Sequence, residues 1–270
     1  MAKQRFSGKV VWITGASSGI GEALALQLVD EGARVIVSAR RAELLEKVKA
    51  RASRPEDVAL LAMDVAQTDL AKTYVEQALA AFGKVDVMVH NAGIGQRSLV
   101  SETPLDEDRR IMEVNYFGVV ALTKALLPEM KARGGGHFVV VSSVTGYVGT
   151  PFRSGYAASK HALHGFFESL RAEGHKENVA VTIVCPGFVD TDIAIKAIER
   201  AGGGEVEKTA TRAKANAHGI SAEQCARVMV DGIAKRSREV YVGGKEIAGI
   251  YARRYAPGLL ARMLRRIETV

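Results

Sequence analysis

The chain alternates short runs of β-branched residues with longer helical patterns, and this alternation limits the folds that it can adopt. Seven runs have the length and composition of buried strands: VVWIT, ARVIVS, VALLAM, VDVMVH, HFVVVS, VAVTIVC and EVYVG. Helical patterns follow six of them, at residues 20–30, 42–50, 70–82, 107–133, 156–173 and 222–235. Because such alternation is typical of a parallel sheet with helices on both faces, we predict an α/β fold with a Rossmann-type, doubly wound, mainly parallel sheet.

Composition and charge limit the domain count and the partners. Of the 270 residues, 47% are hydrophobic and 25% charged, and no repeat or Pro- or Ser-rich linker divides them. We predict one domain over residues 1–244, followed by a C-terminal extension over residues 245–270. The net charge is +7, and more than half of it lies in that extension. No basic face interleaved with aromatic residues is visible, so we expect no nucleic-acid partner.

The cysteines and the first residues indicate the compartment. Cys185 and Cys225 form no short-spaced pair and no Cys/His cluster, so we expect a reducing compartment and no metal site. The first apolar run is too short for a signal peptide or a membrane span, and it fits the first strand better. We therefore expect a cytoplasmic protein.

A glycine-rich turn, TGASSGIGEA, directly follows the first strand and opens a helix. Gly15, Gly19 and Gly21 permit a tight turn and let backbone N–H groups approach a phosphate at the helix N-terminus. The spacing is GxxxGxG, whereas the commoner dinucleotide fingerprint is GxGxxG. The setting between strand and helix favours a dinucleotide site over a plain tight turn.

The same letters also match GxSxG, the nucleophile elbow of α/β-hydrolases, with Ser17 as the nucleophile. Only one strand precedes this serine, where the hydrolase fold places several, and the loop has a third glycine that an elbow does not require. We keep a serine hydrolase as an alternative of another class.

The second strand ends as VSARR, and its last residues bear on the choice of cofactor. Ala39 stands where an NAD-preferring enzyme carries the acid that binds the ribose 2′-hydroxyl, and Arg40 follows. An arginine can pair with a 2′-phosphate through its planar fork. The pair predicts a preference for NADP(H) over NAD(H).

The stretch SGYAASKHA places a phenol and an amine four residues apart on a predicted helix. Tyr156 and Lys160 therefore share one helix face. An ammonium about 4 Å from the phenol oxygen stabilises the phenolate by roughly 4 kcal/mol at an effective dielectric near 20, or about three pKa units. Ser143 ends the preceding strand, where its hydroxyl can bind a carbonyl oxygen beside the phenol. We expect an acid/base device.

In order and spacing these motifs resemble the short-chain dehydrogenase/reductase family, in its single-domain branch, from about residue 9 to residue 244. The resemblance implies a catalytic set of Asn115, Ser143, Tyr156 and Lys160. It also implies a cofactor-binding set of Gly15, Ser17, Ser18, Gly19, Ile20, Gly21, Arg40, Asp64, Val65, Asn91, Ala92, Gly93, Tyr156, Lys160, Pro186, Gly187, Val189 and Thr191. Tyr156 would donate a proton to a carbonyl oxygen that Ser143 polarises. Lys160 would lower the tyrosine pKa and hold the nicotinamide ribose, and Asn115 would support Lys160 through water.

The expected function is therefore an NADP(H)-dependent oxidoreductase that interconverts a carbonyl and a primary or secondary alcohol. Residues 192–220 would form a substrate loop or lid. Five residues suggest a partly apolar pocket for a lipid-like or steroid-like substrate: Tyr147, Val148, Phe152, Phe188 and Ile193. A 3-oxoacyl reductase and a non-catalytic NADPH sensor are the remaining alternatives. His161 and His164 are expected to be ordinary helix residues at or near a subunit contact.

We expect a homodimer or homotetramer formed through helices 107–133 and 156–173. The extension alternates apolar residues with arginines in an amphipathic pattern that breaks at Pro257 and Gly258. It is expected to pack on its own domain or on a second subunit, with peripheral contact to an anionic membrane as the alternative.

Overall fold

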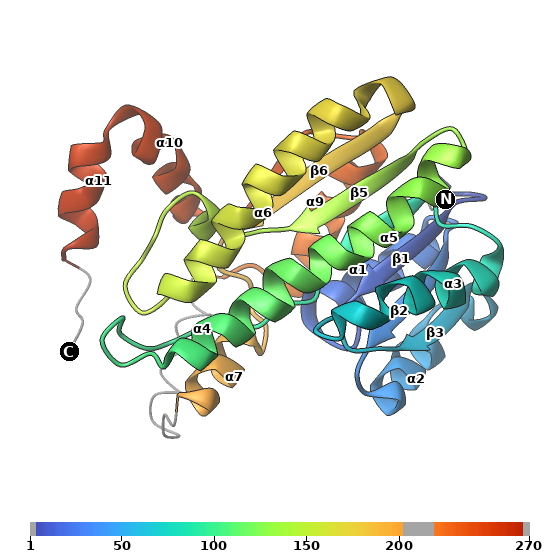
Figure 1. Ribbon diagram of the computed structural model, residues 1–270, viewed down its shortest axis with the longest axis horizontal. Coiled ribbons are helices and arrows are strands. Elements are labelled where there is room, and N and C mark those ends of the chain that lie inside the picture. The colour runs from blue at the N-terminus through green and yellow to red at the C-terminus, as the bar shows by residue number, and fades with distance from the viewer. Residues whose placement is uncertain (1–3, 202–218, 267–270) are drawn as a thin grey trace.

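A seven-stranded, wholly parallel sheet forms the centre of the computed structural model, which describes residues 4–201 and 219–266 (Figure 1). The strand order is β3-β2-β1-β4-β5-β6-β7. The strands are β1 Val10–Thr14, β2 Arg34–Ala39, β3 Val58–Ala62, β4 Val87–His90, β5 Gly136–Val141, β6 Val179–Pro186 and β7 Glu239–Val242. Each lies where the sequence predicted it, and the predicted parallel α/β fold is confirmed.

Helices cover both faces of the sheet because the strands are apolar on both sides. One face carries α1 Gly19–Asp30, α2 Ala42–Arg51 and α9 Ala222–Ala234. The other carries α3 Ala71–Phe82, α5 Gly118–Ala132 and α6 Ser154–Glu173. Alternate residues of β1 serve the two cores, since Val11 and Ile13 pack under the first set and Val10 and Trp12 under the second.

The strand order reverses direction at β1, which has β2 on one side and β4 on the other. The chain therefore leaves β1 and β4 toward opposite faces, and the loops after their carboxyl ends diverge. Such a reversal opens a crevice for ligands in doubly wound sheets. The glycine turn at residues 14–21 and the segment after His90 both begin there.

The predicted helix at residues 107–133 is interrupted by a π-helix. It consists of α4 Leu105–Met112, a π-helical turn at Glu113–Phe117, and α5. Gly118 lies directly after the turn and so close to the carbonyl oxygen of Val65 that a Cβ would collide with it. By length, and by a mean hydropathy of 1.2 over an 18-residue window, the helical segment Leu105–Ala132 could cross a membrane, but it packs along the sheet and buries Leu122, Leu126 and Met130 in the core. It is a core helix.

The chain after β7 forms two short helices at one end of the molecule, away from the sheet (Figure 1). They are α10 Ala248–Tyr255 and α11 Pro257–Leu264, preceded by the 3-10 turn Lys245–Ile247. The amphipathic pattern breaks at Ala256, so Pro257 starts the second helix instead of interrupting the first. In the predicted substrate loop, α7 Ile193–Arg200 is helical, and residues 202–218 lie outside the described residues.

Candidate active site

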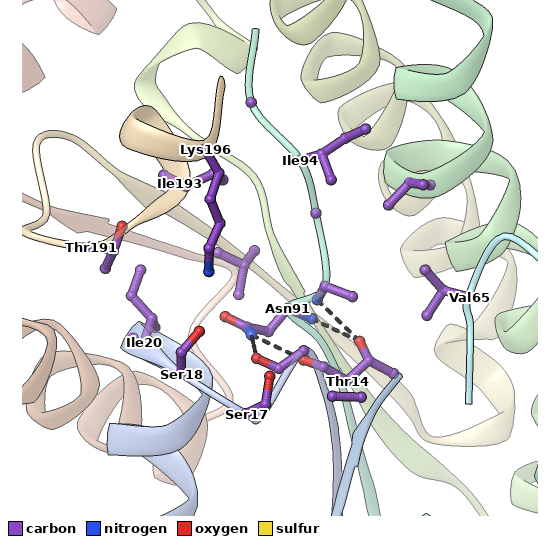
Figure 2. A pocket seen from close by; sticks show the side chains of 18 of the residues that line it. Thr14, Ser17, Ser18, Ile20, Val65, Asn91, Ile94, Thr191, Ile193 and Lys196 are labelled. Carbon is purple, nitrogen blue, oxygen red and sulfur yellow. Dashed lines mark hydrogen bonds between the residues drawn. The ribbon is translucent and has the colours of Figure 1, made fainter. Parts of the chain in front are cut away.

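The glycine turn is joined to the loop after β4 by hydrogen bonds from Asn91 (Figure 2). The Asn91 side-chain amide donates to the carbonyl oxygens of Thr14 (2.9 Å) and Gly15 (3.1 Å). The Thr14 hydroxyl oxygen accepts the backbone N–H groups of Asn91 (3.2 Å) and Ala92 (3.1 Å). These bonds fix the turn relative to β4 and satisfy backbone groups that a turn leaves free.

The glycines of the turn are required by backbone conformation and by space. Gly15 and Gly19 have φ values of +66° and +59°, in the left-handed region that favours glycine. A Cβ on Gly15 would lie 2.7 Å from the Ala92 Cα, and one on Gly21 would collide with the Asn91 amide nitrogen. The turn thus leaves the N-terminus of α1 open toward the crevice, beside the hydroxyls of Ser17 and Ser18. This donor set fits the diphosphate of a dinucleotide.

One cleft of about 340 Å³ collects most of the predicted site residues. Its lining includes Gly15, Ser17, Ser18, Gly19, Ile20, Arg40, Asp64, Val65, Asn91, Ala92, Gly93, Ser143, Tyr156, Lys160, Pro186, Gly187, Val189 and Thr191. Two predicted residues lie behind this lining: Gly21 packs against Asn91, and Asn115 is fully buried. The structure therefore brings the predicted cofactor loop and the predicted acid/base residues into a single cleft.

Asn115 belongs to the π-helical turn and connects two walls of the cleft. Its side-chain oxygen accepts the N–H of Ile94 (2.8 Å), and its amide nitrogen donates to the Ile94 carbonyl (3.0 Å) and to Ser159 Oγ (3.0 Å). Its side-chain oxygen would lie 3.2 Å from a Cβ on Gly93. The sequence predicted Asn115 but not the π-helix, which is frequent at functional sites.

Ser143, Tyr156 and Lys160 meet where β5 and the start of α6 face each other. The Ser143 hydroxyl oxygen accepts the N–H of Thr145 (3.1 Å) and its hydroxyl interacts with the Tyr156 phenol. The Lys160 amine, nearly fully buried, donates to the carbonyl of Val141 (2.8 Å) and lies 5.6 Å from the centre of the Tyr156 ring. A hydroxyl, a phenol and an amine thus border one end of the cleft.

The charge environment of Tyr156 differs from the expected one. Burial raises the pKa of Tyr156 above its ordinary value, while the positive charge of Arg153 and the hydrogen bond to Ser143 lower it by less. Lys160, expected to lower this pKa, does not contribute to it in this arrangement, in which its amine bonds the Val141 carbonyl. Burial lowers the pKa of Lys160 itself to about 8.

Several residues in or beside the site were not found from the sequence. Gln96 accepts the backbone N–H of Tyr156 (3.0 Å) and so holds the first turn of α6. Arg153, which precedes α6, is the charge beside the phenol. Arg110 and Lys196 line the cleft from α4 and α7. No motif marks these four residues, because their roles depend on distant segments meeting.

The apolar pocket expected from the sequence is dispersed in the structure. Ile193 lines the cleft, and Val148 is buried. Phe152 lies under the guanidinium of Arg97, and Phe188 is exposed. Tyr147 packs edge-on against His164, with ring centres 4.4 Å apart.

The remaining histidine and serine expectations have clear outcomes. His164 is buried and its Nε2 bonds Ser142 Oγ (2.8 Å), so it packs inside its own subunit as an ordinary helix residue. Among residues 4–201 and 219–266, no three His, Cys, Asp or Glu side chains gather as a metal site needs. His90 bonds the hydroxyl of Thr123, and His137 bonds the hydroxyl of Thr182. Like His164, they therefore bond a hydroxyl other than that of Ser17. None of these three histidines can act as a base for Ser17.

Comparisons with known proteins agree with this geometry. Residues 9–201 match the family model described as short chain dehydrogenase. The chain is 40% identical over 239 residues to human dehydrogenase/reductase SDR family member 7. The aligned region covers 86% of this chain and 69% of that protein. It resembles a short chain dehydrogenase/reductase from Burkholderia phymatum in complex with NAD (26% identity, TM-score 0.83, covering 94% of this chain and 96% of that one). It also resembles L-sorbose reductase from Gluconobacter frateurii complexed with NADPH and L-sorbose (28% identity, TM-score 0.78, covering 90% of this chain and 97% of that one).

The lowered pKa of Lys160 predicts a pH dependence of stability. Between a pH of about 8, the pKa of Lys160 in the folded chain, and its ordinary pKa of 10.5, the unfolded chain keeps a proton on Lys160 that the folded chain has lost. The contribution of Lys160 to the free energy of unfolding should therefore rise by about 2 kcal/mol between about pH 7 and about pH 9.5, against an opposite contribution from the buried thiols of Cys185 and Cys225, whose pKa values burial raises. Urea unfolding of the wild-type protein and of Lys160→Met measures this, because the variant should lack that rise.

Tyr156→Phe is the matched control, since it retains Lys160 and should retain the rise. Equal pH dependence in the wild type and in Lys160→Met would contradict the lowered pKa.

Proposed function

Because the chain belongs to the short-chain dehydrogenase/reductase family of oxidoreductases, which use nicotinamide cofactors, we propose that it interconverts a carbonyl and a primary or secondary alcohol with NADP(H). The observation that carries the proposal is a single cleft. Ser143, Tyr156 and Lys160 line it together with the glycine turn at the open N-terminus of α1. Residues 1–244 would act as one catalytic domain. When bound, the dinucleotide supplies or accepts the hydride.

The chain's own residues would then supply the proton and position the carbonyl oxygen of the substrate. The raised pKa of Tyr156 keeps the phenol protonated at neutral pH, as a proton donor to a carbonyl oxygen must be. Ser143 donates a hydrogen bond to the same oxygen and fixes its distance from the phenol. The buried amine of Lys160, with a pKa of about 8, can exchange a proton near neutral pH and so return one to the phenol. Asn115 positions this end of the cleft through Ile94 and Ser159.

The preference for NADP(H) is supported by the groups at the end of β2. Ala39 offers no carboxylate, and Arg40 and Arg41 both line the cleft there. A guanidinium pairs well with a 2′-phosphate, whereas a carboxylate at this place would repel it. The two related structures contain NAD in one case and NADPH in the other, so the preference must come from these side chains and not from the family.

For the substrate we infer a hydrophobic ketone or aldehyde, lipid-like or steroid-like. Ile94 and Ile193 line the cleft (Figure 2), and their side chains offer no hydrogen bond to a polyol. The related reductase contains L-sorbose, a polar substrate, which makes a direct comparison informative. A 3-oxoacyl thioester belongs in the same substrate panel.

The C-terminal extension supports a peripheral contact with an anionic membrane surface. Tyr251 and Tyr255 are 54% and 76% exposed one turn apart on α10, and Leu259 and Met263 are each 58% exposed one turn apart on α11. Arginines adjoin both pairs, at positions 253, 254, 262 and 265. Exposed apolar side chains bordered by arginines suit the boundary between headgroups and acyl chains.

Self-association is the second part of the partner proposal. The outward face of α6 exposes small or short side chains at Ala158, His161 and Gly165, and the adjacent π-helical turn exposes Phe117. Another helix can approach such a face closely. We propose that α5 and α6 form the contact between copies in a homodimer or homotetramer.

Tyr156→Phe tests the acid assignment. The variant should lose about 10³-fold in kcat on any carbonyl that the wild type reduces, because the phenyl ring cannot donate a proton. Its Kd for NADPH, measured by cofactor fluorescence, should stay the same. Tyr147→Phe, which removes a phenol outside the cleft, should retain activity.

Retained turnover in Tyr156→Phe would contradict the acid role. NADPH binding by the wild type with no turnover on ketones, aldehydes, sugars or 3-oxoacyl thioesters would support the sensor alternative. Cleavage of an ester by the wild type that is lost in Ser17→Ala would support the serine hydrolase alternative.

Arg40→Asp tests the cofactor preference. Loss of a charge-assisted hydrogen bond and addition of a like charge should move the ratio of the Kd values for NADPH and NADH by about 10- to 100-fold toward NADH. Titration of both cofactors against the wild type and the variant measures the ratio. An unchanged ratio, with a shift in Arg41→Asp instead, would assign the phosphate to Arg41.

The double variant Tyr255→Ser/Leu259→Ser tests the membrane contact. Co-sedimentation with phosphatidylcholine/phosphatidylserine vesicles should fall at least about tenfold relative to the wild type, because the exposed apolar area is lost. Val100→Ser, which removes an equally exposed apolar side chain elsewhere, should sediment like the wild type. If the double variant has a lower molar mass in solution than the wild type but sediments with vesicles to the same extent, the extension would instead be assigned to contacts between copies.

A further inference from the structure

One cation of the cleft belongs to a helix that the sequence assigned only to substrate binding. Lys196 lies in α7, and its side chain extends into the cleft toward the side where Ser17, Ser18 and Asn91 lie (Figure 2). Thr191 and Ile193 of the same segment lie at the same wall. The amine therefore faces the glycine turn from across the cleft.

Two close approaches hold this segment over the cleft. A Cβ on Gly19 would lie 3.1 Å from Thr191 Cγ2, so the start of the segment rests against the glycine turn. A Cβ on Gly95 would lie 3.2 Å from the Ile193 carbonyl oxygen and 3.4 Å from the Ala197 side chain, so α7 rests against the loop after β4. Packing at both ends thus places the segment that carries Lys196 against the walls of the cleft.

The glycine turn offers a diphosphate hydrogen-bond donors but no charge. Residues 14–21 include no lysine or arginine, while the diphosphate of a dinucleotide carries two negative charges. The other cations of the described lining have places elsewhere: Arg40 and Arg41 follow β2, the Lys160 amine bonds Val141, and Arg110 lies 3.8 Å from Glu107. Within the described lining, Lys196 is the cation that faces the turn.

We propose that Lys196 binds the diphosphate of the dinucleotide and so joins α7 to the cofactor. The proposal rests on the proposed function, since it requires a dinucleotide in this cleft. Lys196 now contacts Asp192 one turn earlier, at 3.7 Å, and both side chains are about half exposed. An exposed ion pair at this distance contributes little to stability, so the amine can leave Asp192 and bind a diphosphate instead. A phosphate also accepts shorter, charge-assisted hydrogen bonds.

The position of Lys196 separates this role from recognition of the nicotinamide or the substrate. The diphosphate is common to NADPH, NADH and 2′-phospho-ADP-ribose, which has no nicotinamide. It is absent from adenosine 2′-monophosphate. A residue that binds the diphosphate must therefore affect the first three ligands by the same factor and leave the fourth unchanged.

Lys196→Met keeps the length and the apolar stem of the side chain and removes its charge. Isothermal titration of the full-length variant should show the Kd for NADPH, NADH and 2′-phospho-ADP-ribose raised about tenfold each, with the Kd for adenosine 2′-monophosphate unchanged. The dependence of log Kd on log salt concentration should also become shallower, because one ionic contact is lost. Lys196→Arg should restore the wild-type Kd values.

Lys235→Met is the matched control, since it removes an exposed lysine at the end of α9 and should leave all four Kd values unchanged. Unchanged Kd values in Lys196→Met would overturn the proposal, as would a loss confined to NADPH and NADH, which would place the amine on the nicotinamide half. Failure of the wild type to bind any of the dinucleotides would instead overturn the proposed function.

Discussion

The hydrogen bonds of Asn91 are the contact on which the rest of the site depends. They join β1 to β4 where the strand order reverses, and parallel strands provide no hairpin that would hold these two loops together. The same contact explains the spacing of the glycines. Gly21 is needed because the Asn91 amide occupies the space of its Cβ, and Gly15 because Ala92 lies against it. The motif thus encodes an internal strand-to-strand contact as well as an approach to phosphate.

A chain of hydrogen bonds extends this rigidity from the cofactor turn to the acid/base residues. The loop after Asn91 reaches Ile94, whose backbone pairs with Asn115, and the Asn115 amide donates to Ser159. Ser159 in turn donates to the Tyr156 carbonyl (2.8 Å). The π-helix allows this connection because it places Asn115 inward between α4 and α5. The proposed hydride transfer would need the dinucleotide and the proton donor in fixed register, and this chain of bonds would hold the two sites in place.

The sequence was most informative where one local pattern determines the structure. Buried parallel strands need continuous apolar runs, so all seven strands could be placed, and Tyr156 and Lys160 share a helix face because of their spacing alone. Contacts between distant segments were not predictable. The helical pattern of residues 105–132 has no signal for its π-turn, and Arg153 and Gln96 matter only because α6 begins beside them. The charge beside the Tyr156 phenol was not predicted for the same reason, since spacing does not reveal that Arg153 lies there or that the Lys160 amine bonds Val141.

The orientation of Lys160 bears on both directions of the proposed reaction. Reduction of a carbonyl needs a protonated phenol, and burial of Tyr156 favours that form. Oxidation of an alcohol needs the phenolate, which must be stabilised by positive charge. Arg153 already acts in that sense, and Lys160 can add to it when its amine turns from Val141 toward the phenol oxygen. A buried amine with a pKa of about 8 can adopt either charge state near neutral pH. In the proposed mechanism the same three side chains can therefore serve both directions, with the phenol protonated for reduction and ionised for oxidation.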